Sequence, residues 1–378
     1  MITLRYIFVH LVNDFSGSPR ILADFCASER IKAADPVVVT NHSRGFLNRD
    51  LGRLSYVWYP EFDSKPLKYF FYIFAQIQIF LKVLGFCLKI KWAGEKPVVV
   101  NNTTLCLSSV LASWLMGGVT IVYVHELIAR PLFYREAVRC AVSLMADEVL
   151  LVSNFLLQQY GFKNSRTRVL SNGLRANFRL SEGIDQDSKF EKGSILFVGS
   201  LKPYKGIYEF VELAKRMPEF SFEAVLNCSE RNLMNFRRIV SIPDNLFLQR
   251  QSSDLEQRLK NAFVVVNMSI TELVQEGFAL TVLEGMAAGC PVIVPTRGGH
   301  FDFFNEAAGY ALDAECTDEI VAVITKLRAD KKRWTLCSDA AMEITKSFTS
   351  EKFLQLVDDF LDDLEERYSR GTGESGCH

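Results

Sequence analysis

Apolar residues along the chain gather in short runs that alternate with stretches of helical periodicity. In the first half, runs rich in valine and isoleucine and bounded by turn residues predict buried strands at 4–12, 35–41, 96–102, 119–126 and 147–154. These runs are apolar on both faces, as parallel strands covered by helices require. Helical patterns lie between them, as in 18–31 and 106–118. The alternation predicts a doubly wound α/β sheet.

A polar, charged interval at 179–193 interrupts this pattern and is typical of a linker. Beyond it, strand-like runs resume at 194–200, 220–227, 245–249, 262–269 and 290–295. We therefore expect two α/β domains facing each other, with a ligand site in the cleft at the carboxyl ends of their strands. The expected organisation is an N-terminal domain 1–178, the linker 179–193, a C-terminal domain 194–346, a helix 347–370 that crosses back to the first domain, and a tail 371–378.

Residues 65–92 are unusually rich in aromatic and aliphatic side chains and carry five lysines. A bilayer-spanning helix needs about 20 nearly uninterrupted apolar residues, and Gln76, Gln78 and Lys82 interrupt this run. Three interpretations stay open: a buried helix, a helix lying on an anionic membrane surface, and a true span. Lysines beside aromatic residues favour the interfacial one over what composition alone gives.

The distribution of charge and the cysteine content indicate the kind of partner and the cellular compartment. The net charge is -1, but residues 1–180 hold 21 Lys+Arg against 12 Asp+Glu, which leaves the remainder acidic. A basic first half indicates an anionic partner there. The nine cysteines include no Cys-x-x-Cys pair, which is typical of reduced thiols in a cytoplasmic protein. No Asp-x-Asp pair ends a strand and the five histidines are scattered, so we expect no metal site.

The most informative stretch is 272–295, where Glu276 and Glu284 stand eight positions apart. The pattern predicts that Glu276 lies in a loop after a strand and Glu284 one turn into the following helix. The backbone N–H groups of 277–280 then open that helix, where unsatisfied donors and the helix dipole attract a phosphate. Carboxylates on either side would accept hydrogen bonds from sugar hydroxyl groups. The spacing therefore indicates a site for a nucleotide sugar.

Residues 276–293 resemble the Glu-x7-Glu signature of retaining glycosyltransferase family 4, which has the GT-B fold of two Rossmann-like domains. Residues 195–217 resemble the strand, glycine loop and Lys-Gly helix start of that family, and 98–126 and 146–173 are similar to its first domain. The chain departs from the family at Ser200, where many members carry arginine, and at Ala279, where glycine is frequent. Either the diphosphate is held with one cation fewer, or another basic residue such as Arg250 substitutes.

The resemblance implies roles for individual residues. It places Lys205 on the donor diphosphate, Glu284 on the ribose, and Glu276 and His125 at the transferred sugar, with Glu126 beside His125. His300 is a further candidate to face the donor. The expected catalytic residues are Glu276, His125 and Lys205. The expected donor-binding residues are Gly17, Ser200, Lys205, Arg250, Gly277, Phe278, Ala279, Leu280 and Glu284. The expected acceptor and membrane side comprises Arg20, Lys65, Lys68, Lys82 and Lys89.

The resemblance implies a metal-independent retaining glycosyltransferase without a cofactor. Its donor would be a UDP- or GDP-linked sugar, and its acceptor a hydroxyl group of a lipid-diphosphate-linked saccharide in surface polysaccharide or O-antigen synthesis. We expect a peripheral location at the inner face of the cell membrane and no nucleic-acid partner. Two alternatives stay open, a nucleotide-sugar epimerase of the same architecture and a non-catalytic subunit of a glycosylation complex.

Overall fold

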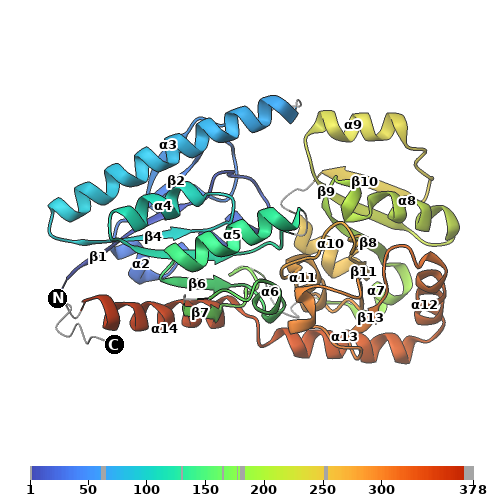
Figure 1. The fold of residues 1–378 in the computed structure, drawn as a ribbon. Coiled ribbons are helices and arrows are strands. Elements are labelled where there is room, and N and C mark those ends of the chain that lie inside the picture. Colours follow the sequence, from blue (N-terminus) through green and yellow to red (C-terminus); the bar gives the residue numbers. More distant parts are fainter. Residues whose placement is uncertain are drawn as a thin grey trace. The chain divides into compact units, whose positions relative to one another are not determined.

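The computed structural model describes residues 2–60, 65–128, 131–163, 166–176, 178, 184–250 and 254–369. The chain divides into two compact units. Unit 1 comprises residues 1–172 and 350–378, and unit 2 comprises residues 173–349. Each unit contains one parallel sheet with helices on both faces (Figure 1). The prediction of two doubly wound α/β domains is confirmed.

The sheet of unit 1 has seven strands in the order β3-β2-β1-β4-β5-β6-β7. The interior strand β1 pairs in parallel with β2 and β4, so that Ile7 lies opposite Val37 on one side and Val99 on the other. All three side chains are buried. The strands are β1 (Leu4–Val9), β2 (Val37–Asn41), β3 (Arg53–Val57), β4 (Lys96–Asn101), β5 (Val119–Val124), β6 (Glu148–Leu151) and β7 (Arg166–Val169).

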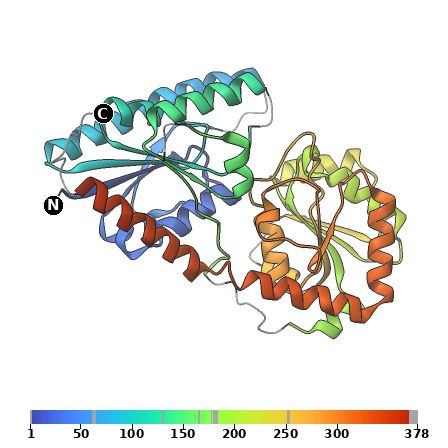
Figure 2. The same ribbon diagram turned by 60° about the horizontal axis from the view of Figure 1, so that its bottom comes forward.

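Two groups of helices cover this sheet. The helices α3 (Lys65–Trp92), α4 (Leu107–Leu115) and α5 (Leu132–Met145) lie on one face, and α1 (Gly17–Cys26) and α14 (Ser350–Ser369) lie on the other (Figures 1 and 2). On the second face, Phe25 of α1 contacts Phe8 and Phe360, which ties the last helix to the core of unit 1. The remaining helices are α2 (Glu29–Ala33), η1 (Arg49–Leu51) and α6 (Asn154–Tyr160).

Unit 2 repeats the plan with six parallel strands in the order β10-β9-β8-β11-β12-β13. The first strand of the unit, β8, is central, and β11 joins it after a crossover. β11 is apolar and buried throughout, and β8 is buried at its apolar residues 195–197. The strands are β8 (Ser194–Ser200), β9 (Phe222–Asn227), β10 (Leu246–Arg250), β11 (Ala262–Val266), β12 (Val292–Val294) and β13 (Gly309–Ala311).

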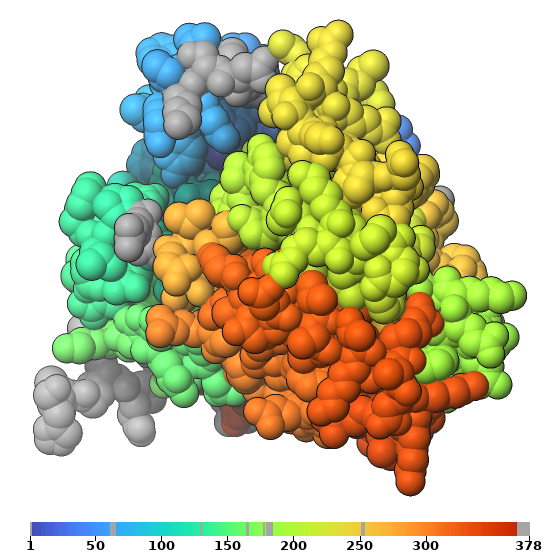
Figure 3. Space-filling model, turned by 90° about the vertical axis from the view of Figure 1, so that its right-hand side faces the viewer, coloured from blue at the N-terminus to red at the C-terminus, as the bar shows by residue number. Residues whose placement is uncertain are grey.

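The helices of unit 2 also form two layers. The first layer packs its apolar stripe on the strands of the core, and Figure 3 shows α8 and α12 of this layer from outside. It comprises α8 (Ile207–Arg216), α9 (Glu230–Ile239) and α12 (Thr317–Ala329). The other helices are α7 (Gln186–Lys192), η2 (Pro203–Lys205), α10 (Leu255–Asn261), α11 (Leu280–Ala287), η3 (Gly299–Asp302) and α13 (Lys331–Thr345).

Part of the expected linker is a helix of unit 2. Residues 179–183 lie outside the described part, but α7 forms within 179–193 and packs on β11, α10 and α13. Its Lys189 is buried, and Nζ donates to the carbonyls of Leu259, at 3.2 Å, and Ala288. The lysine stem packs in the core while the ammonium group is satisfied by backbone oxygens. The high charge of this segment concealed that anchoring role.

Candidate functional site

The carboxyl ends of β8 and β11 bring together a lysine, a glutamate and a serine. Beyond β8, the short helix η2 carries Lys205, whose Nζ forms an ion pair with Glu276. Beyond β11, Ser269 donates a hydrogen bond of 2.6 Å from Oγ to the same carboxylate oxygen, Oε1. Two of the three residues proposed from the sequence as catalytic therefore touch each other. Ser269 was not foreseen, because nothing in the sequence marks a serine three residues past a strand.

The carboxylate of Glu276 is held in its charged form. Burial alone would raise its pKa, but the charge and hydrogen bond of Lys205, the hydrogen bond from Ser269 and the influence of His300 together lower the pKa below the ordinary value. An ionised carboxylate can accept hydrogen bonds from sugar hydroxyl groups and stabilise positive charge nearby. The carboxylate of Glu276 is therefore suited to bind a sugar hydroxyl group or to stabilise a carbocation-like centre.

Backbone geometry around this cluster depends on two residues with positive φ. Gly206 has a φ of +80°, and a Cβ there would lie 1.9 Å from the carbonyl oxygen of Met268, so only glycine fits between η2 and the loop after β11. Ala279 has φ 58° and ψ 61°, the left-handed region that alanine rarely adopts. This turn starts α11, and within the described chain no group accepts a hydrogen bond from the amides of residues 277–281. These amides are available to an anion.

Glu284 lies inside α11 and is only 2% exposed. Its Oε1 accepts a hydrogen bond of 3.0 Å from Nε of Arg175, a residue on the loop that opens unit 2. The guanidinium group compensates the buried carboxylate, which would otherwise be costly. Arg175 was missed in the sequence, although it stands only two residues beyond the Asn172–Gly173 pair that carried part of the resemblance.

Gly298 and Gly299 bring a second loop to the backbone of Glu276. The amide of Gly299 donates to the Glu276 carbonyl at 2.8 Å, and a Cβ on Gly298 would lie 2.9 Å from the His300 ring. His300 itself is fully buried, with Nε2 2.8 Å from the Pro295 carbonyl, and burial lowers its pKa. The histidine supports the loop under Glu276 rather than opening to solvent.

Two residues proposed for donor binding point elsewhere. Arg250 ends the edge strand β10, which β9 separates from β8, and its guanidinium group donates to the Cys228 carbonyl at 3.1 Å. Ser200, where many family members carry arginine, is the last residue of β8. The Phe278 side chain is buried against Phe303, with ring centroids 5.0 Å apart. Only the backbone of Phe278 is left for a ligand.

In unit 1, the carboxyl end of β5 carries His125 and Glu126. Burial, with a smaller contribution from His10, lowers the pKa of His125 to about 3, so the ring is neutral. Burial raises the pKa of Glu126, whose Oε1 accepts hydrogen bonds from the hydroxyl groups of Thr103, at 2.8 Å, and Thr104, at 3.2 Å. Gly17, also proposed as a donor contact, is the first residue of α1 in this unit. The structure thus gives unit 1 a cluster of neutral histidine, carboxyl and hydroxyl groups.

The cations assigned to the acceptor and membrane side have different surroundings. Arg20 is 4% exposed, with Nε 3.4 Å from Asp24, so it is not part of an open basic surface. Lys68 and Lys89 are exposed on α3, and Lys82 lies 3.3 Å from the Ser55 hydroxyl group. Lys65 begins α3, but its side chain lies outside the described part.

Helix α3 has an apolar face on each side. Ala75, Ile79, Val83 and Cys87 repeat every four residues and pack on the sheet of unit 1. Within the described residues, α3 from Pro66 is the helix whose length and composition would allow it to cross a membrane. Its packing on the sheet supports the interpretation as a core helix for this side. The exposed side carries Leu67, Tyr69, Phe70, Ile73, Phe74, Ile77, Leu81, Leu88 and Trp92.

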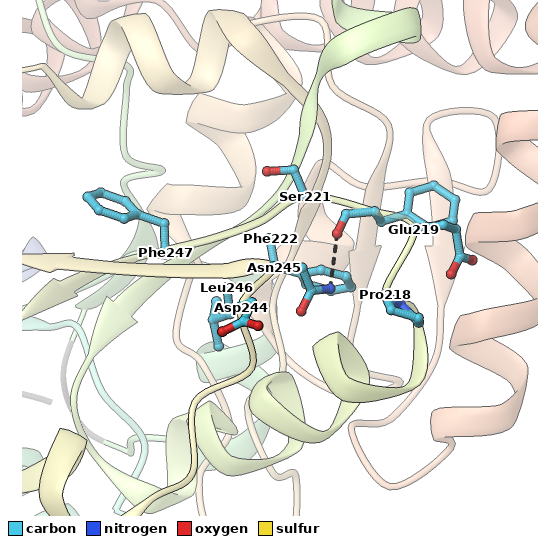
Figure 4. A pocket seen from close by; sticks show the side chains of 9 residues that line it. Pro218, Glu219, Ser221, Phe222, Asp244, Asn245, Leu246 and Phe247 are labelled. Atoms are coloured by element: carbon cyan, nitrogen blue, oxygen red, sulfur yellow. Dashed lines mark hydrogen bonds between the residues drawn. The ribbon is translucent and has the colours of Figure 1, made fainter.

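A separate hollow of about 350 Å³ lies in unit 2, lined by residues 218–222 and 244–247 (Figure 4). Phe222 and Leu246 begin β9 and β10, so the hollow is at the amino ends of these strands. The side chain of Asn245 is used for hydrogen bonds within the protein, one of 3.0 Å to the Phe220 carbonyl. Ligands of such sheets bind at the opposite, carboxyl edge, where Lys205 and Glu276 lie. In the described chain, no group of three or more His, Cys, Asp or Glu residues could hold a metal ion.

Part of the chain matches a known protein family and a curated relative. Residues 182–343 match the family described as "Glycosyl transferases group 1". A curated relative, the processive diacylglycerol alpha-glucosyltransferase of Acholeplasma laidlawii, is 26% identical over 188 residues, which are 47% of this chain and 55% of that protein. The chain thus spans about half the length of this relative.

Solved structures match nearly the whole chain at low identity. HepE of Anabaena, solved in complex with UDP and glucose, has a TM-score of 0.74 at 15% identity and covers 96% of this chain and 99% of its own. Sucrose-phosphate synthase of Thermosynechococcus elongatus has a TM-score of 0.75 at 15% identity, covering 97% and 100%. At this identity the likeness concerns the fold, and the predicted GT-B architecture is confirmed. The chain has the GT-B fold, and residues 182–343 of its second unit match the glycosyl transferases group 1 family.

Proposed function

We propose that the protein is a metal-independent retaining glycosyltransferase that transfers a sugar from a UDP- or GDP-linked donor to a lipid-linked saccharide. The observation that carries the proposal is the Lys205–Glu276–Ser269 cluster beside the free amides that open α11. A cation and a row of N–H groups suit a diphosphate, and an ionised carboxylate suits the sugar beside it. The UDP and glucose complex of HepE supports a nucleotide sugar as the donor.

In this proposal, Lys205 exchanges part of its interaction with Glu276 for the donor diphosphate. The amides of 277–281 bind a phosphate, and Glu284, oriented by Arg175, accepts from the ribose. Glu276 binds hydroxyl groups of the transferred sugar and stabilises positive charge at the anomeric carbon. The departing phosphate takes the acceptor proton on the same face, which retains configuration. Stabilisation of that phosphate by Lys205 and the amides is then the main contribution to catalysis.

Donor binding and slow donor hydrolysis test this site directly. Thermal shifts with a panel of UDP- and GDP-sugars should show one donor that stabilises the wild type and is hydrolysed by it. Glu276→Gln and Lys205→Ala should lose both effects, whereas Lys215→Ala, which removes an exposed lysine of the same unit, should keep them. Binding of no nucleotide sugar would refute the proposal. Donor turnover that needs no acceptor would instead support an epimerase, and binding without turnover under any acceptor a non-catalytic subunit.

We place the acceptor on a membrane because α3 is apolar on both sides. A helix of a soluble domain normally has one polar side, yet the side of α3 away from the sheet carries Phe70, Ile73, Phe74 and Ile77, all 45–64% exposed. Contiguous apolar surface of this kind marks an interaction site. The helix contains lysines and no acidic residue, which fits an anionic lipid surface. Each lysine near such a surface contributes about 1 kcal/mol to the free energy of membrane binding.

The neighbouring helix α4 also carries exposed apolar side chains. Trp114 and Leu115 of α4 are about half exposed, and α4 packs along α3. The curated relative is named for a membrane lipid, diacylglycerol, which supports a lipid acceptor. We infer a peripheral enzyme at the inner face of the cell membrane that lies on its α3 side. The acceptor would be a lipid-diphosphate-linked saccharide of a surface polysaccharide such as O-antigen.

Vesicle sedimentation tests this location independently of catalysis. The protein should sediment with phosphatidylcholine vesicles that contain phosphatidylglycerol, and less so at high salt, because exposed charges are screened. Phe70→Ser combined with Ile73→Ser should abolish sedimentation. Ile239→Ser, which removes a 75% exposed apolar side chain from α9 of unit 2, should not. Equal sedimentation of all three proteins would refute the assignment of this surface.

A further inference from the structure

Asn102 joins two histidines, the buried His10 and the partly exposed His125, at the carboxyl edge of the sheet of unit 1. It follows the last residue of β4 and is fully buried. Its backbone N–H donates a hydrogen bond of 3.0 Å to the Val9 carbonyl. Its side-chain Nδ2 donates to the Ser18 carbonyl at 2.9 Å and lies 3.2 Å from Nδ1 of His10. Its Oδ1 lies 2.8 Å from Nε2 of His125.

These contacts determine where the proton of His125 lies. The Ser18 carbonyl can only accept, so the NH2 group of Asn102 must face it and Oδ1 must face His125. Oδ1 can also only accept, so Nε2 of His125 must carry a hydrogen. A neutral imidazole has one N–H, and Nδ1 of His125 is therefore a bare acceptor. In the described part of the chain no donor reaches this Nδ1, and His125 is partly exposed.

Burial favours the neutral form of the His125 ring. Burial and the neighbouring His10 lower the pKa of His125 to about 3, and burial lowers the pKa of His10 to about 4. Tyr123 lies against the ring with centroids 4.3 Å apart, and Glu126 follows His125 in the chain. The charge of Asp14 raises the pKa of His10, but by less than burial lowers it. At neutral pH, His125 is thus a hydrogen-bond acceptor and cannot serve as a cation.

We propose that Asn102 is a positioning residue that locks His125 as the Nε2–H tautomer, so that its Nδ1 accepts a hydrogen bond from a hydroxyl group of a sugar substrate. The identity of the substrate rests on the proposed glycosyltransferase function, whereas the tautomer does not. The role of Asn102 is indirect, since its side chain is buried between Ser18, His10 and His125. It sets the direction in which His125 can bind.

Nitrogen-15 NMR of the full-length labelled protein reads the tautomer without any substrate. The chain has five histidines, and a His125→Gln variant assigns the signal of interest. At pH 7 the wild type should show a protonated Nε2 and a bare Nδ1 for His125. Asn102→Ala should give the averaged shifts of exchanging tautomers, and Asn102→Asp should give an imidazolium, because a carboxylate at this position raises the pKa of both histidines. Asn41→Ala, which removes a buried asparagine from the end of β2, should leave the His125 signals unchanged.

Kinetics supplies the second measurement. With the donor found by the screen, Asn102→Ala should lose about tenfold in kcat/KM, the value of one hydrogen bond, while donor binding to unit 2 is kept. An Nδ1–H tautomer in the wild type, or an unchanged tautomer in Asn102→Ala, would overturn the proposal. If NMR shows the Nε2–H tautomer of His125 but no nucleotide sugar is turned over, the role of Asn102 is supported and the glycosyltransferase function is refuted.

Discussion

Replacing Ala279 by glycine should stabilise unit 2, although glycine usually destabilises. Ala279 has φ 58° and ψ 61° at the start of α11. An L-residue pays roughly 1–2 kcal/mol in this conformation because Cβ approaches the following carbonyl. Glycine removes that cost but gives the unfolded chain more freedom, which returns part of the gain. The expected net stabilisation is about 1 kcal/mol.

A matched control is the same substitution in an ordinary helix of the same unit. Ala322 is exposed in the middle of α12, and there the change to glycine should cost about 1 kcal/mol. Unit 2 spans residues 173–349, a size at which 1 kcal/mol moves Tm by about 2–4 °C. Native-state hydrogen exchange at β11 and β12 reads the opening of unit 2 separately from unit 1. If both variants are destabilised equally, the left-handed conformation assigned to Ala279 is wrong.

Three further outcomes are expected. Gly206→Ala should lower the Tm of unit 2 and abolish donor binding, because its Cβ would lie 1.9 Å from the Met268 carbonyl oxygen; normal stability would contradict the close approach. Arg175→Ala should raise the donor KM more than Arg175→Lys does, since it removes the cation 3.0 Å from the buried Glu284; equal KM values would exclude the ion pair from donor binding. Unit 1 should lose stability as the pH falls below 6.5, because unfolded histidines bind protons there while the folded pKa values of His10 and His125, about 4 and about 3, keep them neutral. At pH 5 the loss is about 2 kcal/mol per histidine, and urea titrations of wild type and His10→Gln between pH 5 and 7 should show a smaller loss in the variant; the same loss would disprove the assigned protonation.

The sequence predicted the central strands of both sheets because they are buried on both faces. Among the edge strands, β10 fell within a predicted run, but β3, β7 and β13 gave no such signal. In β7, Arg166 and Thr167 are exposed, and β3 begins with the exposed Arg53, so neither reads as an apolar run. The short β13 has three residues, too few for any periodicity. An edge strand is defined by its one neighbour, which a single sequence does not reveal.

In the candidate site, too, the sequence predicted what lies within one segment and missed contacts between segments. Spacing within one segment located Glu276, Glu284 and the start of α11, since a loop and the helix after it are local. Contacts between segments were not accessible in this way. Arg175 reaches Glu284 across 109 residues, and this pairing depends on the fold that brings the two segments together. Strand order is likewise not written in spacing, so the sequence did not show that β9 lies between the strands of Arg250 and Ser200.

The return of α14 to unit 1 has a consequence for synthesis of the protein on the ribosome. Glu148 of β6 is fully buried, and its cation partner Arg367 stands on α14. Phe360 of the same helix completes the aromatic contact with Phe25. A nascent chain that has produced 1–172 therefore lacks both partners until all of unit 2 has been translated. Unit 1 is begun first and finished last, and during that interval it exposes an apolar face and a carboxylate that a chaperone or a premature contact can reach.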